Sequence, residues 1–389
     1  MCRVAGNLLR FDLPGWVRAV RRPLVRFGKF VGGHILPRSR SIVFVSIHPD
    51  DPDALVILEY LARNSDRPLS WMCLGQEPET SLLEAGARER VRSYRIWDFR
   101  SAIQFLRSEL VFHTYGIPGV LHTAQRQTVV NVWHGDGPKV MRPDPMPTTF
   151  MVTGVREFGA RRMKILGLPV DRLLVTGRPR VDDIHRCLAP EDRNSAYARL
   201  GLDDRPIIWW LPTWREGRSG PARLEADLTE IFSGYLLGGA WDEYQFLVKP
   251  HANSPVQEWP KPWRVITAAD LSRSGVRWYQ LLGEASAIIT DYSSVWSDIL
   301  DSSVPCGFLV PDRDEYSLSR GFYMEDWEDL LPGPILYDQH SFVDFLLRLH
   351  EGQFRRQQIH VSHVLGANNS PGATARLFVA LTDLGVQWR

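Results

Sequence analysis

Short buried-strand patterns alternate with helical patterns along most of this chain, and that alternation constrains the fold more than any other feature. The first strand-like runs cover residues 41–47, 69–74, 93–97, 109–114, 127–133 and 148–154. A helical pattern over 52–62 follows the first of them, and helical patterns separate most of the others. Strands that alternate with helices form parallel sheets covered on both faces. The sequence therefore predicts an α/β fold.

The alternation then starts again. Residues 178–180 (RPR) and the polar stretch 188–194 indicate a hinge. Further strand-like runs follow at 206–211, 244–249, 263–267, 286–290 and 305–310. A length of 389 residues fits two domains of the doubly wound kind. We predict an N-terminal domain over 41–185 and a C-terminal domain over 186–389, with the sites at the carboxyl ends of the strands.

The first 40 residues differ from the rest in charge. They hold nine Lys or Arg and one acidic residue, a net charge of +8, whereas the whole chain carries only +1. Between residues 14 and 31, apolar side chains recur every three or four positions with arginines between them. This pattern is typical of a basic amphipathic helix on an anionic membrane surface, or of a helix docked on the protein's own core. The balanced overall charge argues against a nucleic-acid partner.

Several classes of protein are not supported by the sequence. The four cysteines are far apart, so neither a disulfide scaffold nor a zinc site is expected, and no apolar run reaches 18 residues. The glycine-rich motifs of dinucleotide and P-loop sites and the nucleophile elbow of hydrolases do not occur. Two Asp-x-Asp triplets, 51–53 and 312–314, are interpreted as solvated turns rather than metal ligands.

One candidate base follows the strand predicted at 127–133. His134 precedes Gly135, so a substrate could approach the loop closely. An imidazole titrates near neutral pH and can accept a proton from a hydroxyl, and Lys139 could bind a phosphate. A histidine in a turn can equally be structural.

A second histidine loop, residues 249–251 (KPH), follows the strand predicted at 244–249. Here Lys249 precedes His251 by two residues, so a cation again accompanies the imidazole. The two histidine loops come from different predicted domains and both follow strands. We therefore predict that His134 and His251 face each other across a cleft between the domains.

A third cluster, Asp291, Ser293 and Ser294, lies between the strand at 286–290 and a helical run over 295–300. Hydroxyls and main-chain N–H groups at a helix start can bind a phosphate, although Asp291 could instead be a plain helix cap. Arg215 follows the strand at 206–211, and Arg320 precedes Gly321 in another loop. Their planar guanidinium groups suit phosphate oxygens, although a lone loop arginine is often just solvated.

Read in order, these clusters resemble the CDP-glycerol glycerophosphotransferase family, whose members prime or polymerise teichoic acids and related phosphopolyol polymers. The motifs are WHGxxxK (133–139), GRPRxD (177–182), PTWR (212–215), KPH (249–251), ITDYSS (289–294) and RGFYxEDWEDLLPGP (320–334). The resemblance covers roughly residues 110–375 and is strongest over 278–334.

The resemblance implies a GT-B architecture, in which two α/β domains face each other across the active site. It implies that His134 is the acceptor-side base and that His251 is the second essential histidine, beside the donor phosphates. Ser293, Ser294, Arg215 and Arg320 would then lie on the nucleotide side. Many members carry an N-terminal membrane-associating segment, which fits residues 1–40 and a peripheral location on the cytoplasmic face of the membrane.

The implied reaction is attack by an acceptor hydroxyl on the phosphorus of a CDP-alditol, with release of CMP. The expected acceptor is a lipid-linked saccharide or a polyol phosphate. No cofactor is required, although Mg²⁺ could accompany the nucleotide, because the cationic side chains could neutralise the pyrophosphate. Two alternatives stay open: a GT-B glycosyltransferase that uses a nucleotide-sugar, and a catalytically silent scaffold that binds a polyanion or a membrane.

Three positions depart from the family pattern. Asp136 and Gly137 replace the usual Thr-Pro after WHG, Ala252 follows KPH where proline is typical, and Arg178 replaces an asparagine. We expect Asp136 and Arg178 to face the acceptor or the polyol. The transferred unit could therefore be glycerol phosphate or ribitol phosphate.

Overall fold

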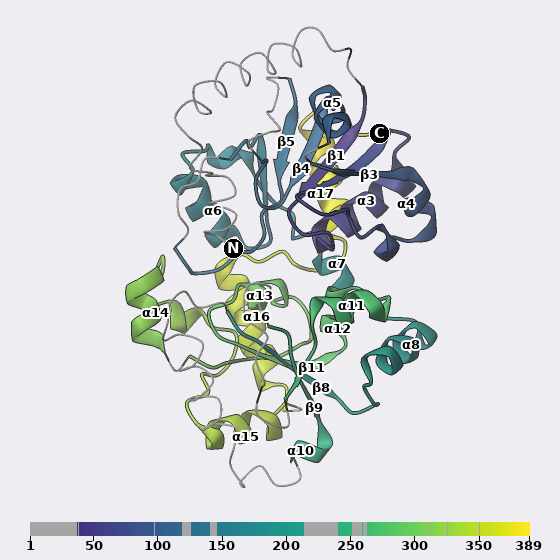
Figure 1. Cartoon of the computed structure of the whole chain (residues 1–389). Helices are drawn as coiled ribbons and strands as arrows, with labels where there is room; N and C mark the ends of the chain where they lie inside the picture. The colour runs from purple at the N-terminus through teal and green to yellow at the C-terminus, as the bar shows by residue number, and fades with distance from the viewer. Residues whose placement is uncertain are drawn as a thin grey trace, which may run out of the picture.

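A computed structural model shows two parallel β-sheets stacked as two lobes (Figure 1). The structure describes residues 37, 39–96, 98–118, 126–140, 146–213, 240–250, 259, 263–310, 312–324, 326–349 and 351–389. The predicted amphipathic helix at 14–31, Arg215 and His251 lie outside these residues. The predicted α/β class with two parallel sheets is confirmed.

The first sheet has seven strands in the order β3-β2-β1-β4-β5-β6-β7, and every neighbouring pair is parallel. These strands are β1 (Ile42–Ser46), β2 (Leu69–Cys73), β3 (Val91–Arg95), β4 (Leu110–His113), β5 (Thr128–Asn131), β6 (Phe150–Thr153) and β7 (Leu173–Val175). The predicted strands all form within one or two residues of their expected positions. Strand β7 was not predicted, because three residues are too few to show an alternating pattern.

Helices cover this sheet on both faces. One apolar cluster joins Phe44 and Phe112 of the sheet to α3 (Pro52–Asn64) and α17 (Ala373–Asp383). A second cluster, on the other face, packs Val43 and Val111 against Phe105 of α5 (Phe99–Arg107). Alternate residues of each strand thus enter opposite clusters, as expected for a sheet buried on both sides.

The second sheet has five parallel strands in the order β10-β9-β8-β11-β12. They are β8 (Ile207–Leu211), β9 (Gln245–Val248), β10 (Arg264–Val265), β11 (Ala285–Thr290) and β12 (Cys306–Phe308). Trp209 faces a cluster that includes helices α8 (Pro190–Leu200), α11 (Ala268–Ser274), α12 (Trp278–Gly283), α13 (Val295–Asp298) and α16 (Gln353–Leu365). Trp210 faces a cluster that includes α15 (Gln339–Leu347).

The remaining helices connect these layers. They are α4 (Ala85–Arg90), α6 (Arg156–Ile165), α7 (Val181–Ile184), α10 (Ala240–Glu243) and α14 (Arg313–Arg320). In the part of the chain that the structure describes, no helix is both long and apolar enough to cross a bilayer.

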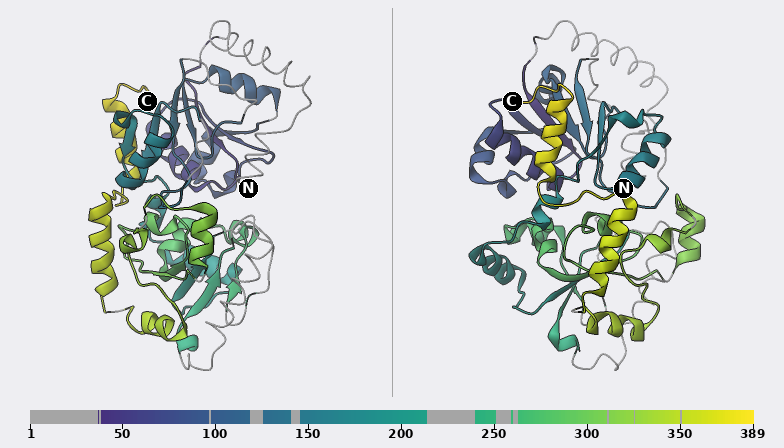
Figure 2. Two further views of the ribbon diagram at one scale, coloured as in Figure 1. Left: turned by 90° about the vertical axis from the view of Figure 1, so that its left-hand side faces the viewer. Right: turned by 180° about the vertical axis from the view of Figure 1, so that it is seen from behind.

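The end of the chain returns to the first lobe. Figure 2 shows the two yellow helices at the back of the molecule, α16 on the lower lobe and α17 on the upper one. Leu377 and Phe378 of α17 are fully buried in the core of the first sheet, and the Phe378 ring stacks on Tyr60 with centroids 4.8 Å apart. The first lobe is therefore built from residues near both ends of the described chain.

Candidate active site

The topology places several loops where parallel sheets usually bind ligands. Each strand order reverses direction once, between β1 and β4 in the first sheet and between β8 and β11 in the second. A ligand site is expected beyond the carboxyl ends of the strands at such a reversal. The loops after β1, β4, β8 and β11 occupy these places, and the His134 loop follows β5, the next strand beside β4.

The chain turns sharply after β5, at Trp133, and His134 follows this turn. Trp133 adopts a left-handed conformation with φ of 62°, which costs roughly 1–2 kcal/mol for a residue with a side chain. Two contacts fix this turn: Asn131 Oδ1 accepts a hydrogen bond from the Trp133 N–H (3.0 Å), and the Arg162 guanidinium lies 4.5 Å from the centre of the Trp133 ring. The loop is held in its strained form by its surroundings.

The environment of His134 keeps its imidazole uncharged. The ring stacks on Tyr115, with centroids 4.7 Å apart and planes 10° apart, and Nδ1 is buried with no hydrogen-bond partner among the described residues. Burial, followed by the charges of Arg162, Arg178, Arg180 and Lys139, holds the pKa of His134 well below its usual value. An imidazole that is neutral at physiological pH, with a free ring nitrogen, can accept a proton.

The glycines of this loop allow direct contact with the second lobe. A side chain at Gly135 would begin 2.2 Å from the Oγ of Ser294, and one at Gly137 would begin 3.2 Å from its Cβ. The Ser297 hydroxyl also donates to the Asp136 main-chain oxygen (2.7 Å). The predicted His134 loop and the predicted serine cluster therefore meet.

Lys139 meets the predicted Gly321 loop through main-chain contacts. The Val140 N–H donates to the Gly321 oxygen (3.1 Å), and the Tyr323 N–H donates to the Pro138 oxygen (2.8 Å). Gly321 has a φ of 72°, the left-handed region that glycine adopts without strain. Arg320 is the last residue of α14 and directly precedes Gly321.

Asp291 has a different contact from the one expected. It is fully buried and accepts hydrogen bonds from the Thr213 N–H (2.9 Å) and the Thr213 hydroxyl (2.6 Å), so it ties the end of β8 to the end of β11. The following helix is also shorter than predicted, since α13 spans only Val295–Asp298. A single turn has little macrodipole, so Ser293 and Ser294, both half-buried, would bind an anion through their hydroxyls and N–H groups rather than through a helix dipole.

Lys249 follows β9 and lies near the first lobe. Its Nζ is 5.1 Å from the centre of the Trp278 ring. Burial lowers the pKa of Lys249, and the charge of Asp50 opposes that shift. Lys249 in turn contributes to the lowered pKa of His48. A cation of the second lobe therefore stands close to the loop after β1.

Sequence reasoning missed two residues of this site, His48 and Tyr115. The His48 ring packs edge-on against Tyr115, with centroids 5.0 Å apart, and Tyr115 stacks on His134. Burial is the main cause that lowers the pKa of His48 and raises that of Tyr115. Neither residue belongs to a motif, but both directly follow predicted strands, at 41–47 and 109–114. That position was the available signal.

Two departures from the family pattern do not face a substrate, contrary to our expectation. Asp136 is fully buried and pairs with Arg162 (2.9 Å), and it also accepts from the Gly154 N–H (2.8 Å). Arg178 is equally buried and pairs with Asp53 (3.2 Å). Buried charges require partners, and each of these two residues has an oppositely charged partner inside the protein, Arg162 for Asp136 and Asp53 for Arg178.

The interpretation of the first Asp-x-Asp triplet as a solvated turn is also wrong. Asp51 and Asp53 are 1% and 0% exposed. Asp51 caps α3 by accepting from the main-chain N–H of Asp53 (3.0 Å) and Ala54 (3.1 Å), while Asp53 binds the two arginines of the predicted hinge. In the second triplet, Asp312 accepts from the Tyr292 hydroxyl and Asp314 is exposed. Among the described residues, no three His, Cys, Asp or Glu side chains converge as a metal site requires.

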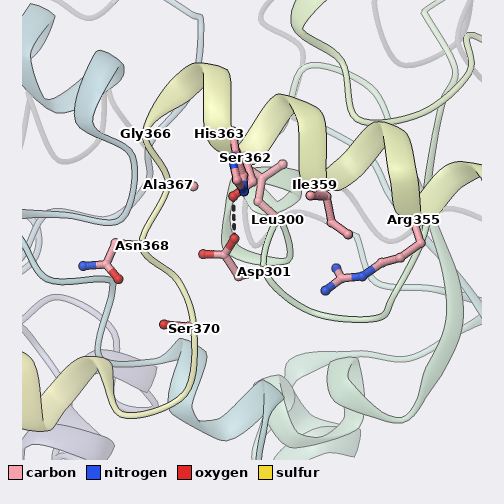
Figure 3. Close-up of a pocket in the computed structure, with 10 residues that line it drawn as sticks. All are labelled: Leu300, Asp301, Arg355, Ile359, Ser362, His363, Gly366, Ala367, Asn368 and Ser370. Atoms are coloured by element: carbon pink, nitrogen blue, oxygen red, sulfur yellow. Dashed lines mark hydrogen bonds between the residues drawn. The ribbon is translucent and has the colours of Figure 1, made fainter.

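A pocket of about 540 Å³ lies elsewhere, where the chain crosses from α16 towards the first lobe (Figure 3). Asp301 stands in its middle and accepts a hydrogen bond from Ser362 (2.6 Å). None of the predicted site residues lines this pocket. The structure thus brings the loops of His134, Lys139, Ser293, Ser294 and Gly321 together and places Lys249 near His48, whereas Arg215 and His251 lie outside the described residues.

Comparison with known proteins decides the family. Residues 164–363, half of the chain, match the family described as CDP-glycerol:poly(glycerophosphate) glycerophosphotransferase. The chain belongs to the CDP-glycerol:poly(glycerophosphate) glycerophosphotransferase family. The resemblance and the enzyme class that the sequence predicts are therefore confirmed.

Individual members of this glycerophosphotransferase family resemble the chain to different extents. The teichoic acid glycerol-phosphate transferase of Staphylococcus aureus is 26% identical over 81% of this chain and 85% of its own length. The teichoic acid poly(ribitol-phosphate) polymerase of Bacillus spizizenii is 24% identical over 63% of this chain, which spans only 42% of that polymerase. The structure of the wall teichoic acid polymerase TagF superposes with a TM-score of 0.72 at 19% identity, covering 95% of this chain and 96% of that one. Another structure of TagF was obtained after a soak with CDPG.

Proposed function

We propose that this chain transfers an alditol phosphate, glycerol phosphate or ribitol phosphate, from a CDP-alditol to an acceptor hydroxyl in the synthesis of a teichoic-acid-like polymer. The acceptor oxygen forms a bond to the phosphorus that carries the alditol. The bond between that phosphorus and the bridging oxygen of the pyrophosphate breaks, and CMP leaves. The product is a phosphodiester, and the proton of the acceptor hydroxyl passes to the enzyme.

The observation that carries this proposal is the position of His134, whose half-buried ring stacks on Tyr115 in the loop that meets Ser294 of the second lobe. A general base has to be unprotonated before the reaction, and burial, followed by the cations around His134, lowers its pKa and so favours the unprotonated form. The proton of the acceptor hydroxyl is proposed to pass to a ring nitrogen of His134. The same cations would stabilise the negative charge that builds up on the transferred phosphate. Membership of the family and its two motif histidines support this role.

The donor is proposed to lie against the second lobe. Lys139, Lys249, Ser293, Ser294 and Gly321 supply cations, hydroxyls and main-chain N–H groups there. Arg215 and Arg320 are proposed to bind the donor as well, because they occupy the arginine positions of the family motifs PTWR and RGFYxEDWEDLLPGP. Asp291 is proposed to act on this side through Thr213, which it holds at the end of β8. A CDPG soak of the related TagF supports a CDP-linked donor.

His251 is proposed to stabilise or protonate the departing CMP, by its place in the KPH motif. This assignment requires a cleft between an acceptor domain, 41–185, which α17 joins, and a donor domain formed by the rest of 186–389, in which the two histidines converge on one phosphorus atom. The contact between Gly135 and Ser294 supports such a closed arrangement, because it joins the two lobes next to His134. The cations on both sides would neutralise the pyrophosphate, so we propose that no resident metal is required, although Mg²⁺ could accompany the nucleotide.

The acceptor is proposed to be a lipid-linked saccharide or a growing polyol-phosphate chain. The basic segment over residues 1–40 would hold the enzyme on the anionic cytoplasmic face of the membrane. Flotation of the full chain with vesicles that contain phosphatidylglycerol tests this location. Vesicles of phosphatidylcholine alone are the control, and equal binding to both would contradict it.

The decisive experiment incubates the full chain with a lipid-linked disaccharide and one donor at a time: CDP-glycerol, CDP-ribitol or a set of nucleotide-sugars. We expect CMP release from a CDP-alditol and a product whose mass increases by one glycerol phosphate or ribitol phosphate. Turnover of nucleotide-sugars alone would overturn the proposal in favour of a glycosyltransferase. A parallel reaction with EDTA tests the metal, and activity is expected to persist.

The matched variant is His134→Ala. Loss of a positioned base is expected to lower kcat by about 10²–10⁴-fold while the protein stays folded. His340→Ala, on the exposed face of α15, is the control and should retain full activity. Unchanged turnover in His134→Ala would exclude this residue as the base. If the parent chain itself were inactive with every donor, a catalytically silent scaffold would be favoured.

A further inference from the structure

Arg180, in the predicted hinge, is only 6% exposed and touches both lobes at once. Its Nε and Nη2 donate to Asp298 of α13 in the second lobe, at 3.0 and 2.7 Å. Its main-chain N–H donates to Asp53 of α3 in the first lobe at 3.1 Å, and its Nη1 lies 3.4 Å from the same carboxylate. The predicted hinge is thus a buried charged junction rather than a free linker.

The same guanidinium also reaches the candidate base. Arg180 Nη1 donates a hydrogen bond of 3.0 Å to the main-chain oxygen of His134. Its position is fixed from the other side as well, since the guanidinium lies 5.1 Å from the centre of the Tyr279 ring and Tyr279 donates to Asp298 (2.7 Å). One side chain therefore ties the His134 loop to α3 and α13 together.

Other charged and titratable groups face His134 from neighbouring elements. Arg162 of α6, Arg178 before α7 and Lys139 of the loop itself add positive charge, and Tyr115 covers the ring. Farther out stand His48, Asp136, Asp53 and Asp51. Arg180 differs from Arg162 and Arg178 in that it also binds an acidic residue of the second lobe. Arg162 and Arg178 are paired with Asp136 and Asp53 of the first lobe.

We propose that Arg180 is a positioning residue for His134, which fixes the His134 loop when both lobes are in place and sets a positive charge beside its imidazole. This inference rests on the proposed function for its effect on turnover. A purely structural arginine would add stability without a selective effect on kcat, and a charge remote from the imidazole would not move its titration. The distinction can therefore be measured directly.

The primary test is NMR titration of His134 in the full chain with ¹³C-labelled histidine, with the signal assigned through His134→Gln. The double variant Arg180→Met with Asp298→Asn removes the ion pair between these two side chains. No buried carboxylate is left without a partner, because Asp53 keeps its pair with Arg178. We expect His134 to titrate at higher pH in this variant than in the parent chain, because a neighbouring cation has been lost. Arg180→Lys keeps the charge, so the titration should stay close to that of the parent.

The kinetic test uses CMP release from CDP-glycerol with a lipid-linked disaccharide. Arg180→Lys loses the fork that holds the His134 oxygen, so kcat is expected to fall about 10- to 100-fold while KM for CDP-glycerol changes little. In the double variant, the acid limb of the pH profile of kcat/KM should move to higher pH, because His134 has to be neutral to act. A fall confined to KM would contradict the positioning role.

The control is Arg277→Met with Asp183→Asn, a buried arginine and its carboxylate partner that do not contact His134. It should leave the His134 titration unchanged. An equal shift in both double variants, or none in the Arg180 variant, would overturn the inference. If the parent chain released no CMP from CDP-alditols but the titration still shifted, the proposed function would fail and the placement of Arg180 beside His134 would stand.

Discussion

Two buried arginines join the lobes of this protein, and they differ in one respect. Arg180 pairs with Asp53 and Asp298, and Arg277 of the second lobe pairs with Asp183 and with Glu59 of α3. Both side chains are nearly inaccessible to water. Arg180 also donates to the main chain of His134, whereas Arg277 donates to that of Leu82. The same type of junction is therefore connected to the candidate active site in one case and remote from it in the other.

This difference shows how a buried charge can acquire a role beyond holding the lobes together. A buried ion pair adds little net stability, because the cost of removing both charges from water offsets their attraction. Its geometric effect is larger, because the partners are fixed once they are buried. At Arg180 that fixed geometry includes the loop of the proposed base. At Arg277 it includes only the turn before α4.

The largest expected effect on stability tests whether the two junctions are equivalent. Arg180→Met and Arg277→Met each leave at least one buried carboxylate without its arginine partner. Each is expected to lower the free energy of unfolding by roughly 3–5 kcal/mol. Guanidinium unfolding followed by circular dichroism measures this loss. Adding Asp298→Asn to the first variant and Asp183→Asn to the second should recover part of it. If only one variant were destabilised, the junctions would not be equivalent and Arg277 would not serve as a control.

The His134 loop, which Arg180 holds, contacts the second lobe through Gly135. Gly135→Ala would place a Cβ 2.2 Å from the Ser294 hydroxyl oxygen and 3.1 Å from its Cβ, so the hydroxyl would have to rotate and the His134 loop would shift against the serine loop. A displacement of about 1 Å at a reacting group can lower the rate about 100-fold, so we expect kcat to fall 10- to 100-fold. CMP release measures this loss, and Ser294→Gly in the same chain should restore part of the free energy of unfolding lost in Gly135→Ala by removing the clash.

Gly86→Ala in α4 is the control for this change, since no atom lies within 4 Å of the added methyl group. It should leave turnover unaltered. Full activity in Gly135→Ala would mean that the two loops can separate without cost, and that closure around His134 is not required.

The sequence was sufficient to predict the strands that carry the site, although not their order in the sheet. The runs at 41–47 and 109–114 became β1 and β4, which lie side by side at the reversal of the first sheet. His48 and Tyr115 follow directly, yet they were not selected, because they belong to no motif. The contact between their rings depends on the register of strands that are distant in sequence. Position after a strand was a better guide there than residue pattern.

Burial was the property that the sequence could not reveal. Arg178, Arg180, Asp51 and Asp53 are polar residues beside prolines, which is typical of exposed turns. In the structure Asp53 pairs with Arg178 and Arg180 in the interior, where each of these charges is stable only because a partner from a distant segment reaches it, whereas Asp51 caps α3. Such compensation depends on three-dimensional proximity. For the same reason Asp136 and Arg178 were wrongly expected to face a substrate.

The smallest effect concerns Asp51, which lies beside the Arg180 junction but has no arginine of its own within ion-pair distance among the described residues. Burial, and then the charge of Asp53, raise the pKa of Asp51 to about 7, against hydrogen bonds from Thr114 and Ala54 that favour the charged form. The carboxyl is therefore protonated in the folded protein at a pH where the unfolded chain has lost that proton. Its contribution to stability is complete below about pH 4 and is lost as the pH rises to about 7.

Asp51→Asn removes this dependence and keeps a side-chain oxygen that can cap α3. One proton contributes at most about 1.4 kcal/mol per pH unit, so the variant should gain roughly 1 kcal/mol relative to the parent between pH 6 and 7 and nothing further above pH 8. Thermal unfolding across that range measures the difference. A parallel pH dependence in both proteins would show that Asp51 is already charged in the folded state. In that case the positive charge of Arg180 would also stabilise the carboxylate of Asp51 at the start of α3. Arg180 would then differ from Arg277 in a second respect.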